Sequence, residues 1–544
     1  MKKNKEVFVQ STKKFCDTTT LHGFKYIYDK NLSIFERLFF GISIAAVCVV
    51  STNFIFNVYQ KWNKNPVIVG IDPVLTFINK VPFPAITICN MNQVLKSKVV
   101  EGNYSKDSAE YAMLLSLCNI AVTPDMISNR TTSTNWDTYS SFLSECAQPC
   151  SAMLLKCTFG GIVNNCSEIF LPVLTDEGLC CVFNTVSTQY MFTRSALSRI
   201  NNSIPNRYVP IDWNIESGYP PDLPQHYYPR VATGPGESLG FSVILNAEVD
   251  DYYCSSTNTA GFKILLHNPT ETPLVKEMGL TLQAGYETKF RIMPDKSDAN
   301  EDIRSIKPAY RQCVFNNENP LLYYRTYSRR NCEMECEAQL FLEKCNCIKY
   351  YMPRIYSNSS VCGIKDIPCI QNISRSSTAF KSKEMTCIDI CMPSCFDLTF
   401  LPVSFSAPIV TEDFKIRENF IQSYNRSYAK SNIAIVNFYY KENSFRSSVK
   451  SQYIGITEFL SNTGGLMGLF IGFSFISLVE IFYYAVIKPF SSIKKQQKGE
   501  KKAPTKRKIR VLYSSRYHRA LNSRTYIGAM TMNGYRANRC PCRI

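Results

Sequence analysis

One apolar stretch near the C-terminal end, Leu466 to Ile487, most constrains how this chain can fold. It is long enough to cross a bilayer as a helix. It is also unlike an ordinary span, because glycines crowd its first half, Gly472-Phe473-Ser474 lies midway, and the carboxylate of Glu480 lies in its second half. An ionisable group at membrane depth is costly and rarely faces lipid. Small residues let backbones approach closely, either between packed helices or around a narrow pore.

A second apolar segment, Leu38 to Phe56, is followed by polar chain without a small-residue cleavage site, which predicts a retained span and not a signal peptide. The net charge of +17 is concentrated at the ends of the chain. Residues 1–37 carry eight Lys or Arg against four acids, and residues 488–544 carry sixteen against one. Basic flanks predict that both termini are cytoplasmic. No basic, aromatic-interleaved patch lies between the spans, so nucleic acid is not an expected partner.

The region between the two spans has the composition of an extracellular domain. It contains nineteen of the 23 cysteines, which fits an oxidising compartment. It also contains seven glycosylation sequons, at Asn103, Asn129, Asn165, Asn201, Asn358, Asn372 and Asn425. The sequence therefore predicts a plasma-membrane protein with a cytosolic arm (1–37), a first span (38–57), an extracellular domain (58–463), a second span (464–487) and a basic tail (488–544). The tail either lies against anionic lipid or is merely solvated.

Two motifs that could carry chemistry are better explained by structure. Gly236-Glu237-Ser238-Leu239-Gly240 matches the nucleophile elbow of hydrolases, which needs a strand before the serine and a helix after it. A Gly/Pro loop precedes Ser238 and a β-rich run follows, so we do not expect an enzyme. Ten cysteines lie within residues 313–395 with no histidine among them, which favours disulfides over a zinc site and leaves their pairing open. No metal or cofactor is expected.

Two features of the C-terminal stretch have alternative explanations. Glu480 either attracts cations at the inner mouth of a pore or is neutralised, or snorkels, near the inner interface. Gly464, Gly468 and Gly472 recur every four residues and can form a helix-packing face. Packing and pore lining are compatible if several subunits pack around one axis.

Several ordered motifs together resemble the degenerin/epithelial sodium channel superfamily, nearest its insect pickpocket branch. The resemblance spans roughly residues 22–490. Its motifs are His22-Gly23 (by itself typical of a turn), Phe83–Asn90, Gly178–Asn184, the cysteine unit 313–395, Gly465–Ser474 and Leu478-Val479-Glu480.

The resemblance implies an α+β membrane protein with two transmembrane helices and a large disulfide-rich extracellular domain. That domain would have a β-sheet palm and β-ball core, a helical finger at about residues 95–180 and a helical thumb at about 313–395. The subunits would assemble as homo- or heterotrimers in membrane lipid. They would surround a pore that selects sodium ions and is commonly amiloride-sensitive.

The resemblance also assigns roles to residues. The selectivity filter falls on Gly472, Phe473 and Ser474, where the bulky Phe473 would have to point away from the axis. His22 and Gly23 form an N-terminal gating motif, and Glu480 is an acid below the filter. The gate positions are Ser461, Asn462 and Gly465.

The same resemblance implies a nested ladder of disulfides. Its pairs are Cys313–Cys395, Cys332–Cys391, Cys336–Cys387, Cys345–Cys369 and Cys347–Cys362, with Cys89–Cys181 and Cys157–Cys166 outside the ladder. Two further bridges are expected among the five remaining cysteines of this region, with the odd one free or intermolecular; the five are Cys118, Cys146, Cys150, Cys180 and Cys254. Tyr310 would couple the thumb to the first span through Tyr59 or Trp62.

The sequence thus predicts a subunit of a gated, sodium-selective, amiloride-sensitive cation channel with a sensory role. The alternatives are a non-conducting two-pass receptor or adhesion protein and an auxiliary subunit of a heteromeric channel. One departure concerns the stimulus: acid-sensing relatives carry clustered carboxylates where residues 372–384 of this chain are basic with one acid, so gating by protons through that cluster is not expected.

Overall fold

The computed structural model describes residues 2–64, 66–118, 134–199, 209–357, 359–378, 386–409 and 419–491. The chain forms two compact units, one from the chain up to Val49 together with the chain from Met467 onward, and the other from Val50 to Leu466. Three predicted glycosylation sites, Asn129, Asn201 and Asn358, lie outside the described residues, as does the basic tail from residue 492 onward.

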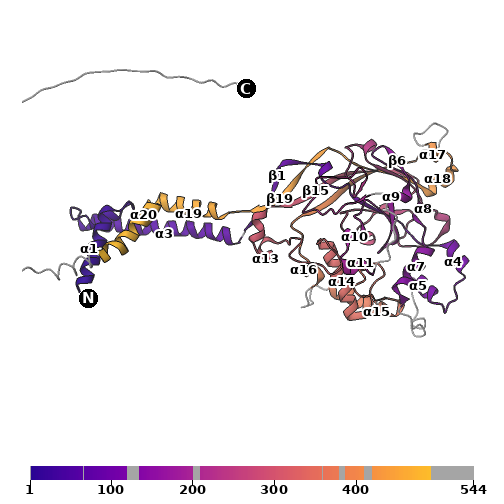
Figure 1. Ribbon diagram of the computed structural model, residues 1–544, viewed down its shortest axis with the longest axis horizontal. Helices are drawn as coiled ribbons and strands as arrows, with labels where there is room; N and C mark the ends of the chain where they lie inside the picture. The colour runs from indigo at the N-terminus through magenta and orange to yellow at the C-terminus, as the bar shows by residue number, and fades with distance from the viewer. Residues whose placement is uncertain are drawn as a thin grey trace, which may run out of the picture. The chain divides into compact units, whose positions relative to one another are not determined.

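The unit from Val50 to Leu466 is built on an eight-stranded mixed sheet (Figure 1). Its order is β1-β19-β15-β18-β11-β5-β6, and β17 pairs with β15. Strand β15 runs parallel to β18 and β19, and the other pairings are antiparallel. The strands are β1 (Val67–Phe77), β5 (Leu154–Phe159), β6 (Ile162–Asn164), β11 (Phe241–Asn246), β15 (Tyr286–Ala299), β17 (Asp397–Pro408), β18 (Ile433–Tyr440) and β19 (Ser444–Gln452).

A five-stranded sheet lies in the same unit, in the order β14-β13-β2-β8-β7. Its strands are β2 (Ala85–Asn90), β7 (Phe170–Thr175), β8 (Gly178–Phe183), β13 (Phe262–His267) and β14 (Leu280–Leu282). Three short pairs complete the β structure of the described residues: β3 (Asn92–Leu95) with β12 (Tyr252–Ser255), β4 (Thr134–Asn135) with β16 (Ser360–Val361), and β9 (Val209–Pro210) with β10 (Tyr227–Tyr228).

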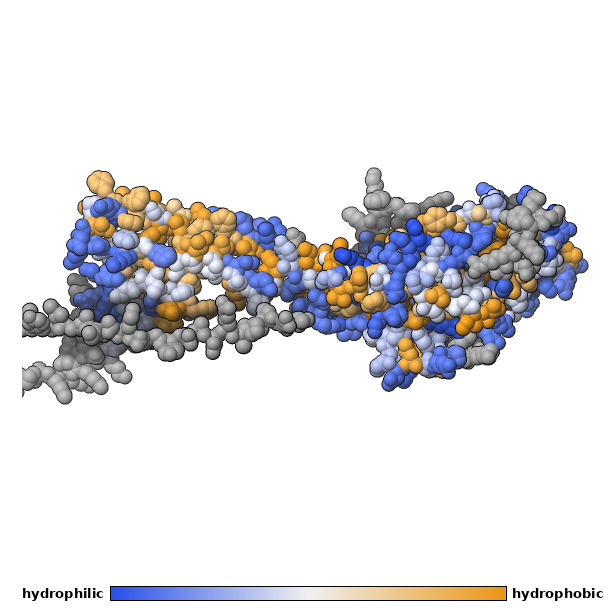
Figure 2. Space-filling view, turned by 90° about the horizontal axis from the view of Figure 1, so that it is seen from above, coloured by the Kyte–Doolittle hydropathy of each residue, from blue (hydrophilic) through white to orange (hydrophobic). Residues whose placement is uncertain are grey.

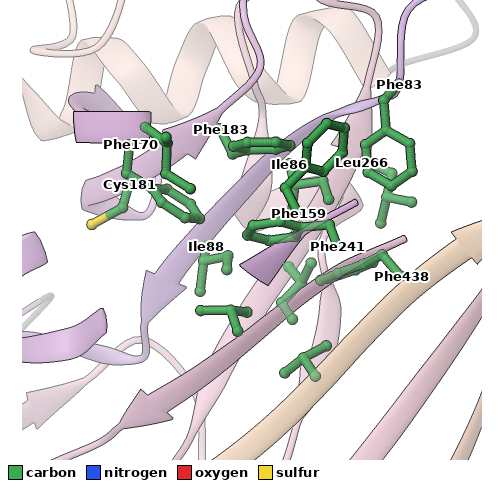
Figure 3. Close-up of a cluster of buried hydrophobic side chains, with 14 of the residues drawn as sticks. Phe83, Ile86, Ile88, Phe159, Phe170, Cys181, Phe183, Phe241, Leu266 and Phe438 are labelled. Carbon is green, nitrogen blue, oxygen red and sulfur yellow. The ribbon is translucent and has the colours of Figure 1, made fainter. Parts of the chain in front are cut away.

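An aromatic core joins the two sheets (Figure 3). Phe183 of β8 stacks on Phe241 of β11, with ring centroids 4.3 Å apart. Phe159 and Phe170 contact the same pair of rings at 5.4–6.5 Å. Each such aromatic pair adds about 0.5–1.5 kcal/mol beyond the burial of apolar area. The sheets are therefore one packed body, which can carry a displacement from one sheet to the other.

Helices occupy the flanks of these sheets (Figure 1). The region predicted as the finger contains α4 (Lys96–Gly102), α5 (Ala109–Leu117), α7 (Trp136–Cys146) and α8 (Cys150–Met153). The region predicted as the thumb contains α14 (Arg329–Cys345), α15 (Ile367–Thr378) and α16 (Cys387–Ile390). The shorter helices are α9 (Cys166–Ile169), α10 (Thr188–Met191), α11 (Arg194–Leu197), α12 (Val275–Met278), α13 (Pro308–Arg311), α17 (Asn419–Gln422) and α18 (Arg426–Asn432), with 3-10 turns at Ile78–Lys80, Glu237–Leu239, Val249–Asp251, Glu301–Ser305 and Ile364–Asp366.

Helix α14 is held at its start and on its buried face. The Ser328 hydroxyl caps the helix by accepting a hydrogen bond from the backbone N–H of Asn331. The buried carboxylate of Glu335 accepts the backbone N–H groups of Leu322 and Tyr323 at 2.8 and 2.9 Å. A buried carboxylate is tolerated when such donors satisfy it. This helix is therefore fastened to the loop that precedes it.

Nine disulfides lie among the described residues. Six are pairs that the sequence predicts: Cys157–Cys166, Cys313–Cys395, Cys332–Cys391, Cys336–Cys387, Cys345–Cys369 and Cys347–Cys362. Of the nested bridges, Cys336–Cys387 joins α14 to α16 and Cys345–Cys369 joins α14 to α15. Because crosslinks restrict the unfolded chain, they add to the stability that the small core around Met334, Ala338 and Phe341 of α14 provides.

The predicted pair Cys89–Cys181 is wrong. Cys89 bridges Cys180, and Cys181 bridges Cys150. Cys180 and Cys181 are neighbours on β8, so their side chains point to opposite faces of the sheet. The register of β2 and β8 places Cys89 directly opposite Cys180, with their Cα atoms 4.4 Å apart. Cys118 bridges Cys254, and Cys146 is the odd cysteine, which is free and buried.

The remaining helices carry the apolar stretches. They are α1 (Lys2–Thr18), α2 (Phe24–Tyr28), α3 (Ile34–Lys64), α19 (Ile456–Ile471), α20 (Phe475–Phe482) and a π-helix (Tyr483–Ile487). Among the described residues, α3 is long and apolar enough to cross a membrane by itself. Helices α19 and α20 pass the same test only as one span bent by 70°. Their surfaces expose large apolar side chains (Figure 2), such as Phe35 at 84% and Phe475 at 91%.

Candidate functional site

The C-terminal apolar stretch, Leu466 to Ile487, is broken where the sequence predicts the filter. Helix α19 ends at Ile471, and Gly472 takes a left-handed φ of +72°. The Gly472 N–H still donates to the Gly468 carbonyl at 2.9 Å. Glycine is the residue that most readily ends a helix in this conformation, because it has no Cβ to collide with the following carbonyl. Gly472 therefore stops α19.

Ser474 starts the next helix. Its hydroxyl accepts a hydrogen bond from the Ser477 N–H at 3.2 Å, and the Ser474 N–H donates to the Ser477 hydroxyl at 3.1 Å. This reciprocal cap sets α20 on its new direction. The Gly-Phe-Ser motif thus has a conformational explanation, since the glycine ends one helix and the serine begins another. Phe473 lies between them, and its N–H donates to the Met467 carbonyl at 3.3 Å.

His22 lies against this break. Its backbone N–H donates to the Ile471 carbonyl at 2.9 Å, which satisfies one of the carbonyls that the end of α19 leaves without a helical partner. A Cβ on Gly472 would lie only 2.8 Å from the His22 ring. The N-terminal motif and the predicted filter are therefore one local structure, although 450 positions separate them in the sequence.

Gly23 is required by conformation and by space. Its φ of +84° is left-handed, and it precedes the short helix α2. A Cβ there would lie 2.9 Å from Cδ1 of Ile44 on α3. The predicted turn at His22-Gly23 is therefore present, and it turns the chain so that the backbone of Gly23 meets α3.

Glu480, the predicted pore acid, is engaged by the N-terminal arm. Its Oε2 accepts the Thr20 N–H at 3.0 Å and the hydroxyls of Thr19 and Thr20 at 3.2 and 3.3 Å. The Thr20 hydroxyl also lies 2.8 Å from the hydroxyl of the buried Ser477. The sequence analysis did not identify Thr19 or Thr20. A run of hydroxyl residues directly before His22 is the signal that could have pointed to them.

Helix α1 lies along the π-helix that follows α20, and the sequence analysis predicted only an arm there. The Ser11 hydroxyl donates to the Tyr484 carbonyl at 2.8 Å, and the Thr18 hydroxyl lies 2.9 Å from the Tyr484 hydroxyl. The Phe15 ring is 5.7 Å from that of Tyr484. A π-helix lacks the regular i to i−4 bonds, so carbonyl acceptors become available for such partners.

The predicted gate residues Ser461, Asn462 and Gly465 lie on α19 and are exposed. Two residues before Ser461, Phe459 stacks on Trp62 near the end of α3, with ring centroids 5.0 Å apart. Tyr59 lies 6.1 Å from the same indole. The predicted coupling partner Tyr310 is 58% exposed, whereas Trp62 contacts Phe459 of α19.

The sheet connects directly to both helices at this point. Strand β1 follows α3 and pairs with β19, which precedes α19. Val67 lies opposite Gln452 in this pairing, and the Tyr453 N–H donates to the Pro66 carbonyl at 2.9 Å. A shift of this edge of the sheet would therefore move the ends of α3 and α19 together.

Two other predicted features lie away from this region. Ser238 lies in the 3-10 turn Glu237–Leu239, which leads into strand β11 and not into a helix, so the geometry of a nucleophile elbow is missing. The described sequon asparagines, at Asn103, Asn165, Asn372 and Asn425, are all exposed.

Comparison with known proteins gives a family match over most of the chain. The model of the family described as amiloride-sensitive sodium channel matches residues 15–484. Pickpocket protein 28 of Drosophila melanogaster is 42% identical over 485 residues, which cover 88% of this chain and 78% of that protein. Sodium channel protein Nach of the same organism is 23% identical, with 86% of each chain covered. Acid-sensing ion channel 1 of Gallus gallus is 22% identical, with 87% of this chain and 83% of that protein covered.

Among solved structures, one proton-activated chloride channel determined by cryo-EM aligns with 84% of this chain and 96% of its own. Its TM-score is 0.27 and its identity 8%. This likeness is too low to bear on the fold.

Proposed function

Because the chain belongs to the amiloride-sensitive sodium channel family, we propose that it is a pore-forming subunit of a gated, sodium-selective cation channel of the plasma membrane. The described residues provide two apolar helical segments, α3 and the bent pair α19–α20, that could span the bilayer. With the basic flanks, this arrangement supports two spans and two cytoplasmic termini.

The observation that carries the proposal is the helix break at Gly472–Ser474. A break in an apolar helix frees backbone carbonyls from the helical ladder, and carbonyl oxygens are ligands that can replace the hydration shell of a cation. Irregular backbone at membrane depth is tolerated where it lines a cavity or is buried in protein. A break of this kind would have little use in a protein whose second span served only as an anchor.

The pore itself needs more than one chain. A single bent helix cannot enclose a path for ions, so the proposal includes assembly with further subunits, as a homo- or heterotrimer. The exposed face of α19 with Ser461, Asn462 and Gly465 would then surround the axis and act as the gate. A glycine that exposes the backbone, such as Gly465, would permit close approach of neighbouring helices.

The test is expression in oocytes with a substitution that prevents closure. Ser461→Val places a bulky side chain at the gate and should produce a standing sodium current that amiloride blocks. Ser461→Ala, which stays small, is the matched control and should leave the current at the wild-type level. If surface-expressed Ser461→Val gives no current, alone or with related subunits, the chain is a non-conducting receptor or adhesion protein and the proposal is wrong.

The filter assignment has its own test in the Ser461→Val background. Ser474→Thr retains an N-cap hydroxyl and Ser474→Ala removes it. If the hydroxyl lines the constriction, the reversal potential in mixed sodium and potassium should shift for Ser474→Ala more than for Ser474→Thr. An unchanged reversal potential in both variants would remove Ser474 from the selectivity filter.

A further inference from the structure

We propose that Glu480 is a positioning residue, which latches the N-terminal arm to α20 and so holds His22 at the helix break, and is not a binding site for the permeating cation. The consequence for conduction rests on the proposed channel function, whereas the latch itself does not. Three observations support it: the three donors on one carboxylate oxygen, the geometry of the arm, and the link from the latch to the cap of α20.

The first observation is the set of donors on one carboxylate oxygen. Oε2 of Glu480 accepts the Thr20 N–H and the hydroxyls of Thr19 and Thr20, all within 3.3 Å. An ionised carboxylate has about four acceptor sites on its two oxygens, and three donors from the arm converge on Oε2. Hydrogen bonds to an ionised acceptor are roughly twice as strong as neutral ones. They also offset the cost of a carboxylate in an apolar segment.

The second observation is that the arm is attached on both sides of the break. At one end, Thr20 binds Glu480 on α20. Two residues later, the His22 N–H binds the Ile471 carbonyl at the end of α19. A segment of three residues therefore spans the bend between the two helices. Releasing Thr20 would leave the backbone of His22 as the remaining hydrogen bond from this segment to the break.

The third observation is a chain of hydroxyl contacts that ends at the predicted filter. The Thr20 hydroxyl lies 2.8 Å from the Ser477 hydroxyl, which accepts the Ser474 N–H. Ser477 is completely buried, so water cannot readily replace Thr20 as its partner. The orientation of the cap at Ser474 is therefore coupled to the hydrogen bonds that Glu480 accepts from the arm.

The electrical test compares Glu480→Gln with Thr20→Val in the Ser461→Val background. Both changes weaken the latch, the first by removing the charge and the second by removing a hydroxyl donor while leaving the N–H. Both should shift the equilibrium between closed and open states in the same direction by about ten-fold or more, the scale expected for a lost hydrogen bond to a charged group. Single-channel conductance should stay unchanged. The double variant should change open probability no more than the larger single change, because both act on one contact.

Glu36→Gln is the matched control for the loss of an acid. Its carboxylate accepts the backbone N–H and hydroxyl of Ser33 at the start of α3, away from the break. It should alter neither open probability nor conductance. The proposal is overturned if Glu480→Gln lowers single-channel conductance, as a cation site predicts, or if Thr20→Val leaves gating unchanged.

A second test does not depend on current. Thr20→Cys and Ser477→Cys together place two thiols where the hydroxyl oxygens are 2.8 Å apart. Oxidation of isolated membranes holding the full chain, with Cys16→Ser to remove the nearest free thiol of the arm, should form an intrachain disulfide that mass spectrometry detects. A bridge in a protein that never conducts would support the latch and refute the channel. Absence of the bridge in surface-expressed protein would overturn the latch even if the channel conducts.

Discussion

Gly472→Ala is expected to destabilise the helix break. Two causes can be separated: strain in the backbone and a steric collision with His22. An L-residue at a left-handed φ costs about 1–2 kcal/mol relative to glycine. The added Cβ would also lie 2.8 Å from the ring of His22, but this ring is the exposed end of a side chain and can rotate away. The backbone strain should therefore account for most of the loss, and the collision for little.

Gly464→Ala supplies the matched control within α19. No atom lies within 4 Å of a Cβ built there, and its backbone is helical. Alanine in a helix interior is favoured over glycine by about 1 kcal/mol. The two substitutions, chemically identical, should therefore differ by about 2–3 kcal/mol in opposite directions.

The assay is thermal unfolding of the full-length protein in detergent, followed by fluorescence-detected size exclusion with identical heating for each variant. Gly472→Ala should melt below the wild type and Gly464→Ala at or above it. His22→Ala should rescue Gly472→Ala only slightly. In that His22→Ala background, Gly472→Asn should be milder than Gly472→Ala, because asparagine tolerates the left-handed region.

Equal melting temperatures for Gly472→Ala and Gly464→Ala would refute the left-handed break. A full rescue by His22→Ala would instead show that the collision, and not the backbone, limits substitution at this position. Either result is obtained without measuring an ion current, so it bears on the geometry of the break and not on conduction.

Three further predictions concern the unit from Val50 to Leu466. Peptide mapping without reduction should recover Cys89 bridged to Cys180; a peptide joining Cys89 to Cys181 would contradict the register of β2 and β8. Burial raises the pKa of Glu271 from 4.5 to about 7, so the unfolded chain ionises first and stability should fall as the pH rises from about 4.5 to 7. The Glu271→Gln variant should show a smaller fall in melting temperature over this range, and an unchanged fall would contradict the raised pKa of Glu271. Trp62→Ala should alter open probability more than Trp62→Phe, because only Trp62→Phe keeps a ring stacked on Phe459 of α19. Such an aromatic pair contributes about 0.5–1.5 kcal/mol. Equal effects of the two substitutions in current recordings would exclude the stack.

Much of this molecule could be predicted from local patterns in the sequence. The apolar stretches, the alternating strand Ile433–Tyr440 and the density of cysteines each follow from short-range regularities, and strand β18 has the bounds that were predicted. Six disulfides follow the order of cysteines that the family resemblance supplies. Nested bridges are robust to small errors in element boundaries, because the order of the cysteines along the chain determines the pairing.

The wrong prediction for Cys89 shows what local sequence patterns cannot determine. Adjacent cysteines have the same local sequence environment, and only the face of the strand decides which one meets a given partner. A register shift of one residue would exchange Cys180 and Cys181 without changing any local propensity. The pairing of β2 with β8 therefore had to be known before the disulfide could be assigned.

At the candidate site, the sequence by itself determined the residues, and the tertiary structure decided what they contact. Gly472 and Ser474 are a helix stop and a helix start by their intrinsic conformational preferences, so the break is a local property. The hydrogen bonds from His22 to Ile471 and from Thr20 to Glu480 join segments at opposite ends of the chain. No local propensity encodes such contacts, because they form only when packing brings the two ends together. Glu480 was a costly acid in the sequence, and the tertiary structure supplied the donors that satisfy it.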